Sequence, residues 1–355
     1  MDVPIPEETT LSNSDGVEIN DAMDNRLIEL LAILSELRTL CKSKMNKLGL
    51  NDTQRVIDFF LSGIDVKSLV EQYQLFSNDR NSSTGQFSYG GALHCIHDFV
   101  RTDAFVRGVV HHVTKMRGQL KRPMRVLDAG CGPVGILGIT AALTDPQVQV
   151  ILLDINTIST IIAEKIVEKF NLQDRVRVVC ADAMTWQPKE LQDLLVSETM
   201  YVGFTQGEKL PNIMANLSKF VQPRGKIMPQ YVTVEIGIED PVTGTLIAPF
   251  TVGQRFEFAP SKTVDVSGVN AHSHFPSPVV LQEGRRFYRL IASTVGLAPD
   301  IVIRPESGAH ITDPLVIGEE YGDGTTRNGF IVKYPIGAFY NDDESRLIGG
   351  DITPY

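Results

Sequence analysis

Cysteine is scarce in this sequence of 355 residues, and no long apolar run occurs in it. The four cysteines, Cys41, Cys95, Cys131 and Cys180, lie far apart and share no paired spacing. This excludes a disulfide framework and a cysteine-based zinc site, and it predicts reduced thiols in a cytoplasmic protein. No stretch approaches the roughly 20 apolar residues of a membrane-spanning helix, and no signal peptide is recognisable. We therefore expect no membrane partner.

Positive charge is also in short supply. The chain has 33 Lys and Arg against 43 Asp and Glu, which gives a formal net charge of −10. Non-specific nucleic-acid binding needs a basic surface, so we expect no nucleic-acid partner. An acidic chain leaves room for a cationic partner, although acidity also serves solubility alone.

The apolar pattern changes along the first part of the chain. Residues 1–25 contain seven acidic residues and no Lys or Arg, and we interpret them as a flexible tail. Residues 26–85 carry apolar residues at helical spacing and predict three helices. This helical region either packs on the main domain or forms a dimer contact. We favour the dimer contact, and hence a homodimer, because "LIELLAILSELRTL" is apolar over more than one face.

Two further regions follow. In residues 86–229, "RVLDAG", "QVQVILLDIN" and "RVRVVCADAM" read as strands, with helices between them. This alternation predicts an α/β domain with a parallel sheet covered by helices on both faces. In residues 230–355, Val-, Ile-, Thr- and Tyr-rich runs are separated by Pro, Gly, Asp and Asn, which is typical of an antiparallel barrel or sandwich.

A glycine-rich turn follows the first predicted strand. "LDAGCGPVG" places Gly130, Gly132 and Gly135 between that strand and a helix. Glycine lets a ligand approach the main chain, and the helix N-terminus offers unpaired N–H groups. Ligands of open parallel sheets bind at this carboxyl edge, where the strand order reverses. The spacing also matches the dinucleotide fingerprint, so NAD is a competing ligand.

Three details favour S-adenosylmethionine over a dinucleotide. Asp128 precedes the turn, where a carboxylate repels a pyrophosphate but suits an ammonium group. Pro133 removes an N–H that a diphosphate would use. Asp182 follows the third strand beside Ala183, where it can bind an adenine amino group. In either case Asp154 ends the second strand and suits ribose hydroxyls.

These motifs resemble a known family. "VLDAGCGPVGI", "LLDIN" and "CADAM" are similar to the nucleoside-site motifs of class I S-adenosylmethionine-dependent methyltransferases, which have a Rossmann-like fold. "HDFVRTDAFVRGVV" resembles a segment of protein arginine methyltransferases, and "SETMYVGFTQGEKL" resembles their two-glutamate hairpin. The resemblance covers residues 87–234 by motif and the rest by architecture, including the β-rich C-terminal domain.

The resemblance implies a role for each matching residue. Arg101 would bind the carboxylate of the donor, and the glycine turn its methionine portion. Glu198 and Glu208 would hold a guanidinium by charge-assisted hydrogen bonds. The implied donor-binding residues are Arg101, Asp128, Gly130, Gly132, Asp154, Ile155, Asp182 and Ala183, and the implied catalytic residues are Glu198, Glu208 and His310. No metal is required for the transfer.

The acceptor part departs from the family pattern. The two glutamates are ten residues apart, one more than the family norm, and "GFTQGE" replaces an aromatic-rich tip. Trp186 is the only tryptophan, so the family's Thr-His-Trp loop lacks its aromatic residue, although His310 in "AHITDPL" aligns there weakly. We therefore predict a methyltransferase that acts on nitrogen or another heteroatom of a small-molecule acceptor. The alternatives are a protein arginine methyltransferase and a non-catalytic donor-binding or assembly partner.

The remaining helical histidines are interpreted structurally. His94 and His97 lie on one helical face, but no third metal ligand is evident. His111 and His112 are expected at a solvated helix end.

Overall fold

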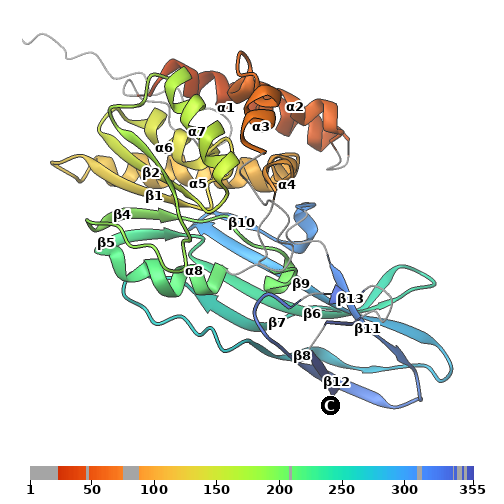
Figure 1. Cartoon of the computed structure of the whole chain (residues 1–355). Helices are drawn as coiled ribbons and strands as arrows, with labels where there is room; N and C mark the ends of the chain where they lie inside the picture. Colours follow the sequence, from red (N-terminus) through yellow and green to blue (C-terminus); the bar gives the residue numbers. More distant parts are fainter. Residues whose placement is uncertain are drawn as a thin grey trace, which may run out of the picture.

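The computed structural model describes residues 23–44, 48–74, 88–207, 210–309, 314–338, 340–341, 346–347 and 350–355. Figure 1 shows an N-terminal helical layer in red and orange, a central α/β part, and an antiparallel β part in green and blue. The order of these parts along the chain is the predicted one. The predicted tail lies outside the described residues, except for residues 23–25.

A parallel sheet of five strands forms the centre of the fold, in the order β3-β2-β1-β4-β5. The strands are β1 (Met124–Ala129), β2 (Val148–Asp154), β3 (Val176–Cys180), β4 (Gln192–Val196) and β5 (Val221–Met228). β4 is buried along its whole length, as expected for a strand with both faces covered. The strand order reverses between β1 and β4, so the carboxyl ends of these two strands mark the switch point where such sheets bind ligands.

Helices cover both faces of this sheet. They are α5 (Phe99–Arg117), α6 (Ile136–Thr144), α7 (Thr157–Lys169) and α8 (Leu210–Leu217). α6 and α7 lie on one side and α8 on the other (Figure 1). Right-handed crossovers require this arrangement, because β1, β2 and β3 progress towards one edge while β4 and β5 progress towards the other. The predicted Rossmann-like architecture is confirmed.

The C-terminal part is built from antiparallel strands, which confirms the predicted β-rich region. One sheet has the order β10-β9-β6-β7, with β11 also paired to β9, and a second sheet has the order β15-β12-β8. Strands β7 and β8 lie beside each other. The strands are β6 (Tyr231–Asp240), β7 (Thr245–Glu257), β8 (Val269–Val280), β9 (Arg286–Ala298), β10 (Ile301–Ile303), β11 (Leu315–Tyr321), β12 (Thr326–Tyr334) and β15 (Asp351–Pro354). The short strands β13 (Tyr340–Asn341) and β14 (Arg346–Leu347) form a two-stranded sheet of their own, and β14 contacts β11.

The N-terminal layer consists of α1 (Asn25–Ser43), α2 (Leu50–Leu61) and α3 (Val66–Gln74). α1 packs on α2 and α6, and α3 packs on α7. Leu27, Leu30 and Leu34 of α1 have no exposed surface within the single chain. Side chains buried in their own chain cannot form a surface for a second copy. The prediction that these leucines, the leucine stripe of α1, make a dimer contact is therefore wrong. The alternative, packing on the main domain, is confirmed.

α5 joins the sheet to the antiparallel part, because it contacts both β4 and β9. His112 of this helix is 3% exposed, and its Nε2 donates to the carbonyl oxygen of Leu297 at 2.8 Å. Burial lowers the pKa of His112 to about 4, so the ring is neutral at physiological pH. The prediction that this residue lies at a solvated helix end is wrong, because β9 covers a surface that the local sequence pattern leaves polar. Among the described helices, none has the length and apolarity that crossing a bilayer requires.

Candidate functional site

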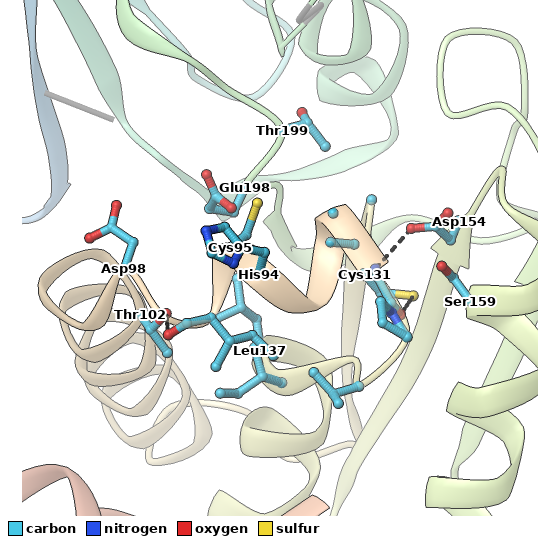
Figure 2. Close-up of a pocket in the computed structure, with 18 of the residues that line it drawn as sticks. His94, Cys95, Asp98, Thr102, Cys131, Leu137, Asp154, Ser159, Glu198 and Thr199 are labelled. Carbon is cyan, nitrogen blue, oxygen red and sulfur yellow. Dashed lines mark hydrogen bonds between the residues drawn. The ribbon is translucent and has the colours of Figure 1, made fainter. Parts of the chain in front are cut away.

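A cavity of about 1040 Å³ lies at the switch point of the parallel sheet. The ends of β1, β2 and β4 form its floor, and α2, α4 (Tyr89–Cys95) and the start of α5 contribute the opposite wall. Figure 2 shows His94, Cys95 and Asp98 on one side of the site, with Asp154 and Ser159 on the other. The predicted residues that line this cavity are Arg101, Asp128, Gly130, Gly132, Asp154, Ile155, Asp182, Ala183 and Glu198. Glu208 and His310 lie outside the described residues.

The glycine turn needs glycine for two separate reasons. Gly130 and Gly132 have φ angles of +78° and +62°, which side chains disfavour. A Cβ on Gly130 would also lie 2.2 Å from Cγ2 of Thr199, in the segment after β4. The amides of Gly130 and Cys131 donate to the Leu153 carbonyl oxygen at 2.7 and 3.0 Å. The turn is therefore fixed between the ends of β2 and β4.

Asp154 connects this turn to the end of β2. Its Oδ2 accepts from the Gly132 amide and its Oδ1 from the Asn156 amide, both at 2.8 Å. Burial raises the pKa of Asp154 above its ordinary value, although these amides oppose the shift. At the end of β3, Oδ1 of Asp182 accepts from the Met184 amide at 2.8 Å. Two carboxylates are thus held at neighbouring strand ends, as the sequence predicted.

Asp128 also binds the first turn of α6, a role that was not predicted from the sequence. Its side chain is buried, and Oδ2 accepts from the Gly138 amide in the first turn of α6 at 2.8 Å. The N-cap of α6 is Gly135, which has no side chain to cap the helix. Burial raises the pKa of Asp128 to about 7, and the charges of Asp154 and Glu198 add to the shift. Asp128 therefore changes charge near neutral pH.

Replacing Asp128 by Asn is expected to stabilise the ligand-free protein at alkaline pH. In the unfolded chain this carboxyl titrates near 3.8, and in the folded chain near 7. The folded state therefore holds the proton more tightly, and stability from this group is lost as pH rises between those values. Asn cannot ionise and its amide oxygen can still accept from Gly138. The gain in free energy of unfolding should approach about 4 kcal/mol by pH 8.

Thermal unfolding between about pH 5 and pH 8 measures this effect. The Tm advantage of Asp128→Asn over the unmodified chain should widen as pH rises. Asp174→Asn is the control, because Asp174 is exposed beside the amino end of β3. A Tm difference that stays constant with pH would contradict the assigned titration.

Arg101 links three elements around the cavity. Its Nη1 lies 3.3 Å from Oε1 of Glu198, its Nε lies 3.5 Å from Oδ2 of Asp98, and its Nη2 donates to the Cys95 carbonyl oxygen at 2.5 Å. Burial disfavours the charged form of Arg101 and would lower its pKa. The negative charges of Glu198 and Asp98 outweigh this effect, so the pKa of Arg101 is raised. Burial likewise raises the pKa of Glu198, which Arg101 offsets in part. The two side chains form a nearly buried ion pair at the cavity wall.

Acidic side chains outnumber basic ones in the described lining of the cavity. Its described lining includes five carboxylates, Asp98, Asp128, Asp154, Asp182 and Glu198, and a single guanidinium, that of Arg101. Such a wall favours ligands that carry positive charge and disfavours a diphosphate.

Residues 126–225, from β1 into β5, match a sequence family described as a methyltransferase domain. The chain contains a methyltransferase domain. This domain is of the class I, S-adenosylmethionine-dependent type, and it resembles the corresponding domain of protein arginine methyltransferases.

Known proteins similar to the chain extend this comparison. The probable protein arginine N-methyltransferase 6.1 of Oryza sativa subsp. indica is 29% identical over 181 residues, or 51% of this chain and 43% of the relative. The japonica relative of the same name has the same identity, with 41% of its length covered. The chain thus spans less than half of the length of these relatives.

A solved structure shows the same fold. A chain of the Trypanosoma brucei PRMT1 enzyme-prozyme heterotetrameric complex with AdoHcy superposes with a TM-score of 0.50. It is 16% identical, and the match covers 75% of this chain and 98% of that one. At this identity the likeness concerns the fold alone.

The N-terminal helix α2 contributes to the wall of the cavity, which was not predicted from the sequence. Thr53 of α2 bonds through Oγ1 to Nδ1 of His97 at 2.6 Å, and both residues line the cavity. Asp98 accepts from the Arg101 amide at 3.3 Å as the N-cap of α5. An Asp three residues before Arg101 is a readable capping signal. The contact between α2 and the turn that joins α4 to α5 carries no such signal, because its partners are 44 residues apart. Among the described residues, no group of three or more His, Cys, Asp or Glu side chains could hold a metal ion.

Proposed function

We propose that the protein transfers a methyl group from S-adenosylmethionine to a guanidinium nitrogen of an arginine in a protein or peptide. The observation that carries this proposal is the cavity at the switch point, which five carboxylates and one guanidinium line together with the glycine turn. A sulfonium donor and a guanidinium acceptor are both cations, so this wall suits both. The relatives named as probable arginine methyltransferases favour a peptide over the small-molecule acceptor that the loop sequence suggested.

We assign the donor to the strand ends. Asp154 and Ile155 would hold the ribose, and Asp182 with Ala183 the adenine. The turn at Gly130–Gly132 would contact the methionine portion, whose ammonium would lie near Asp128. The donor supplies a methyl group bound to sulfonium sulfur, and an in-line displacement at that carbon needs positioning above all.

Arg101 and Glu198 would bind the donor and the acceptor, respectively. The carboxylate of the donor would pair with Arg101, which loosens the contact of 3.3 Å between Arg101 and Glu198. Glu198 would then hold the guanidinium acceptor by charge-assisted hydrogen bonds. When the N–C bond forms, the C–S bond breaks and its electron pair stays on sulfur, so S-adenosylhomocysteine leaves as a neutral thioether. The acceptor nitrogen releases one proton to water, and the methylated guanidinium keeps its single positive charge.

Transfer of a labelled methyl group from S-adenosylmethionine tests the proposal. The full chain should label arginine-containing peptides, and replacement of every arginine by lysine should abolish the signal. Free arginine and small guanidines serve as competing acceptors. Labelling of small guanidines alone would overturn the peptide acceptor. Tight binding of S-adenosylhomocysteine without transfer to any acceptor would overturn the enzyme and leave a donor-binding partner.

The assembly and the compartment stay predictions. We propose a homodimer, which light scattering on the full chain would measure. The partner surface is not the leucine stripe of α1, because that stripe is buried within the chain. A cytoplasmic location is likewise expected and is tested by localising the tagged chain.

A further inference from the structure

The segment after Glu198 is held by the antiparallel part of the protein. We call residues 201–207 the acceptor loop, because they continue from Glu198 along the cavity. Oη of Tyr334, the last residue of β12, donates to the Gly203 carbonyl oxygen at 2.7 Å. The Gly203 amide donates to Oγ of Ser293 in β9 at 2.8 Å. Both backbone groups of one loop residue are therefore bound by side chains of the β part.

The turn after β12 continues this contact. The amides of Gln206 and Gly207 donate to the carbonyl oxygens of Ala338 and Gly337, at 2.8 and 3.1 Å. In return, the Gly337 amide donates to the Phe204 carbonyl oxygen at 2.7 Å. The buried ring of Phe204 meets Phe256 of β7 edge-on, with ring centres 4.9 Å apart. The acceptor loop and the turn at 335–338 thus pair through their backbones.

The acceptor loop has a shape that it would not keep by itself. Phe204 and Gln206 both have a φ of +58°, although neither is glycine. Such left-handed residues persist only where the surroundings hold them. Gly203 is also left-handed, with φ of +59°, and a Cβ there would lie 2.5 Å from Oη of Tyr334. The contacts from β9 and β12 supply that support.

The acceptor loop forms one wall of the cavity. Tyr201 and Gly207 line it, together with Glu198, Thr199 and Met200 immediately before the loop. Most of the assigned donor residues lie at the ends of β1, β2 and β3. The two nearest this wall, Arg101 and Gly130, lie against Glu198 and Thr199, which precede the acceptor loop. A shift of the acceptor loop would therefore move the acceptor side of the cavity and leave the donor side in place.

We propose that Tyr334 is a positioning residue for the acceptor, acting through the acceptor loop without touching the donor. This inference rests on the proposed function, because it assumes that the acceptor enters along Glu198. It also explains how the β part contributes to the reaction, since its contact with the acceptor loop fixes the wall that the acceptor meets. Burial raises the pKa of Tyr334 well above its ordinary value, so its hydroxyl remains a donor at physiological pH.

The Tyr334→Phe variant of the full chain tests this role. It keeps the ring and leaves the Gly203 carbonyl oxygen without its partner. Amide hydrogen exchange of residues 203–207 should accelerate by about tenfold, while the amides of Gly132 and Asn156 keep their rates. The kcat/KM for an arginine peptide should fall by about tenfold, with the Kd for S-adenosylhomocysteine changed less than about twofold.

Matched variants separate this role from a general loss of stability. Ser293→Ala removes the bond on the other side of Gly203 and should act in the same direction, which keeps the test available if Tyr334→Phe folds poorly. Tyr321→Phe is the control, because Tyr321 is 60% exposed on β11.

Unchanged exchange in the acceptor loop would overturn the inference, and so would faster exchange with an unchanged kcat/KM. If the unmodified chain methylates no arginine peptide, the proposed function fails and the positioning role fails with it. Hydrogen exchange then still decides whether Tyr334 holds the loop.

Discussion

The Asp154→Ala variant is expected to bind S-adenosylhomocysteine about 100-fold more weakly, or worse. Each oxygen of this carboxylate already accepts one backbone N–H, from Gly132 and from Asn156, so the group is fixed in direction. A ribose would add hydrogen bonds to a charged acceptor, which contribute about 1.5–3 kcal/mol each. Loss of the carboxylate also frees the Gly132 amide, so the glycine turn loses a contact to β2.

Isothermal titration calorimetry measures the loss, and thermal unfolding checks that the variant is folded. We expect only a modest fall in Tm, because the freed Gly132 amide lies at the cavity, where water can replace the lost bond, although Asn156 is buried. Asp174→Ala is the matched control, since it removes an exposed carboxylate from the opposite edge of the same sheet. An affinity within about threefold of the unmodified chain would remove Asp154 from the donor site.

The Glu198→Gln variant is expected to lose about 100-fold in kcat/KM for the acceptor while it keeps its affinity for the donor. Gln keeps the shape of the side chain but cannot form charge-assisted hydrogen bonds to a guanidinium. Arg101 retains Asp98 and the Cys95 carbonyl oxygen, so it remains available to the donor. Burial raises the pKa of Glu198. As the pH falls, activity that needs the charged carboxylate should therefore begin to decline at a higher pH than it would with an exposed glutamate.

Steady-state kinetics with an arginine peptide and calorimetry with S-adenosylhomocysteine separate the two sides of the site. Glu190→Gln is the control, because Glu190 pairs with Arg125 near the amino end of the sheet. Normal turnover by Glu198→Gln would show that this carboxylate does not contact the acceptor. An equal loss of donor and acceptor binding would show that the ion pair with Arg101 only supports the fold.

The part of the cavity at the strand ends could be predicted because its information is local. Asp128, Asp154 and Asp182 lie at or just beyond the ends of consecutive strands, and parallel strands bring their carboxyl ends to one edge. The glycines follow from the tight turn after β1. Each of these features is readable within a few residues of the chain.

The contacts that complete the site could not be predicted, because hydrophobic patterns report burial and not the partner. Arg101 and Glu198 are 97 residues apart, and Tyr334 and Gly203 are 131 apart. The same limit explains the two errors. The leucines of α1 were correctly expected to pack against another surface, but that surface is formed by α2 and α6 of the same chain. His112 was expected at a solvated helix end because the local pattern gives no sign that β9 covers it.

The central claim is that the cavity at the β1–β4 switch point holds an S-adenosyl nucleoside, and a crystal structure of the chain grown with S-adenosylhomocysteine tests it most directly. We predict density for the nucleoside in this cavity, with the ribose hydroxyls within hydrogen-bond distance of Asp154 and the adenine beside Asp182. A parallel crystal grown with NAD should show no ligand there. A pyrophosphate seated on Gly130–Gly132, or a cavity that stays empty at saturating S-adenosylhomocysteine, would contradict the account.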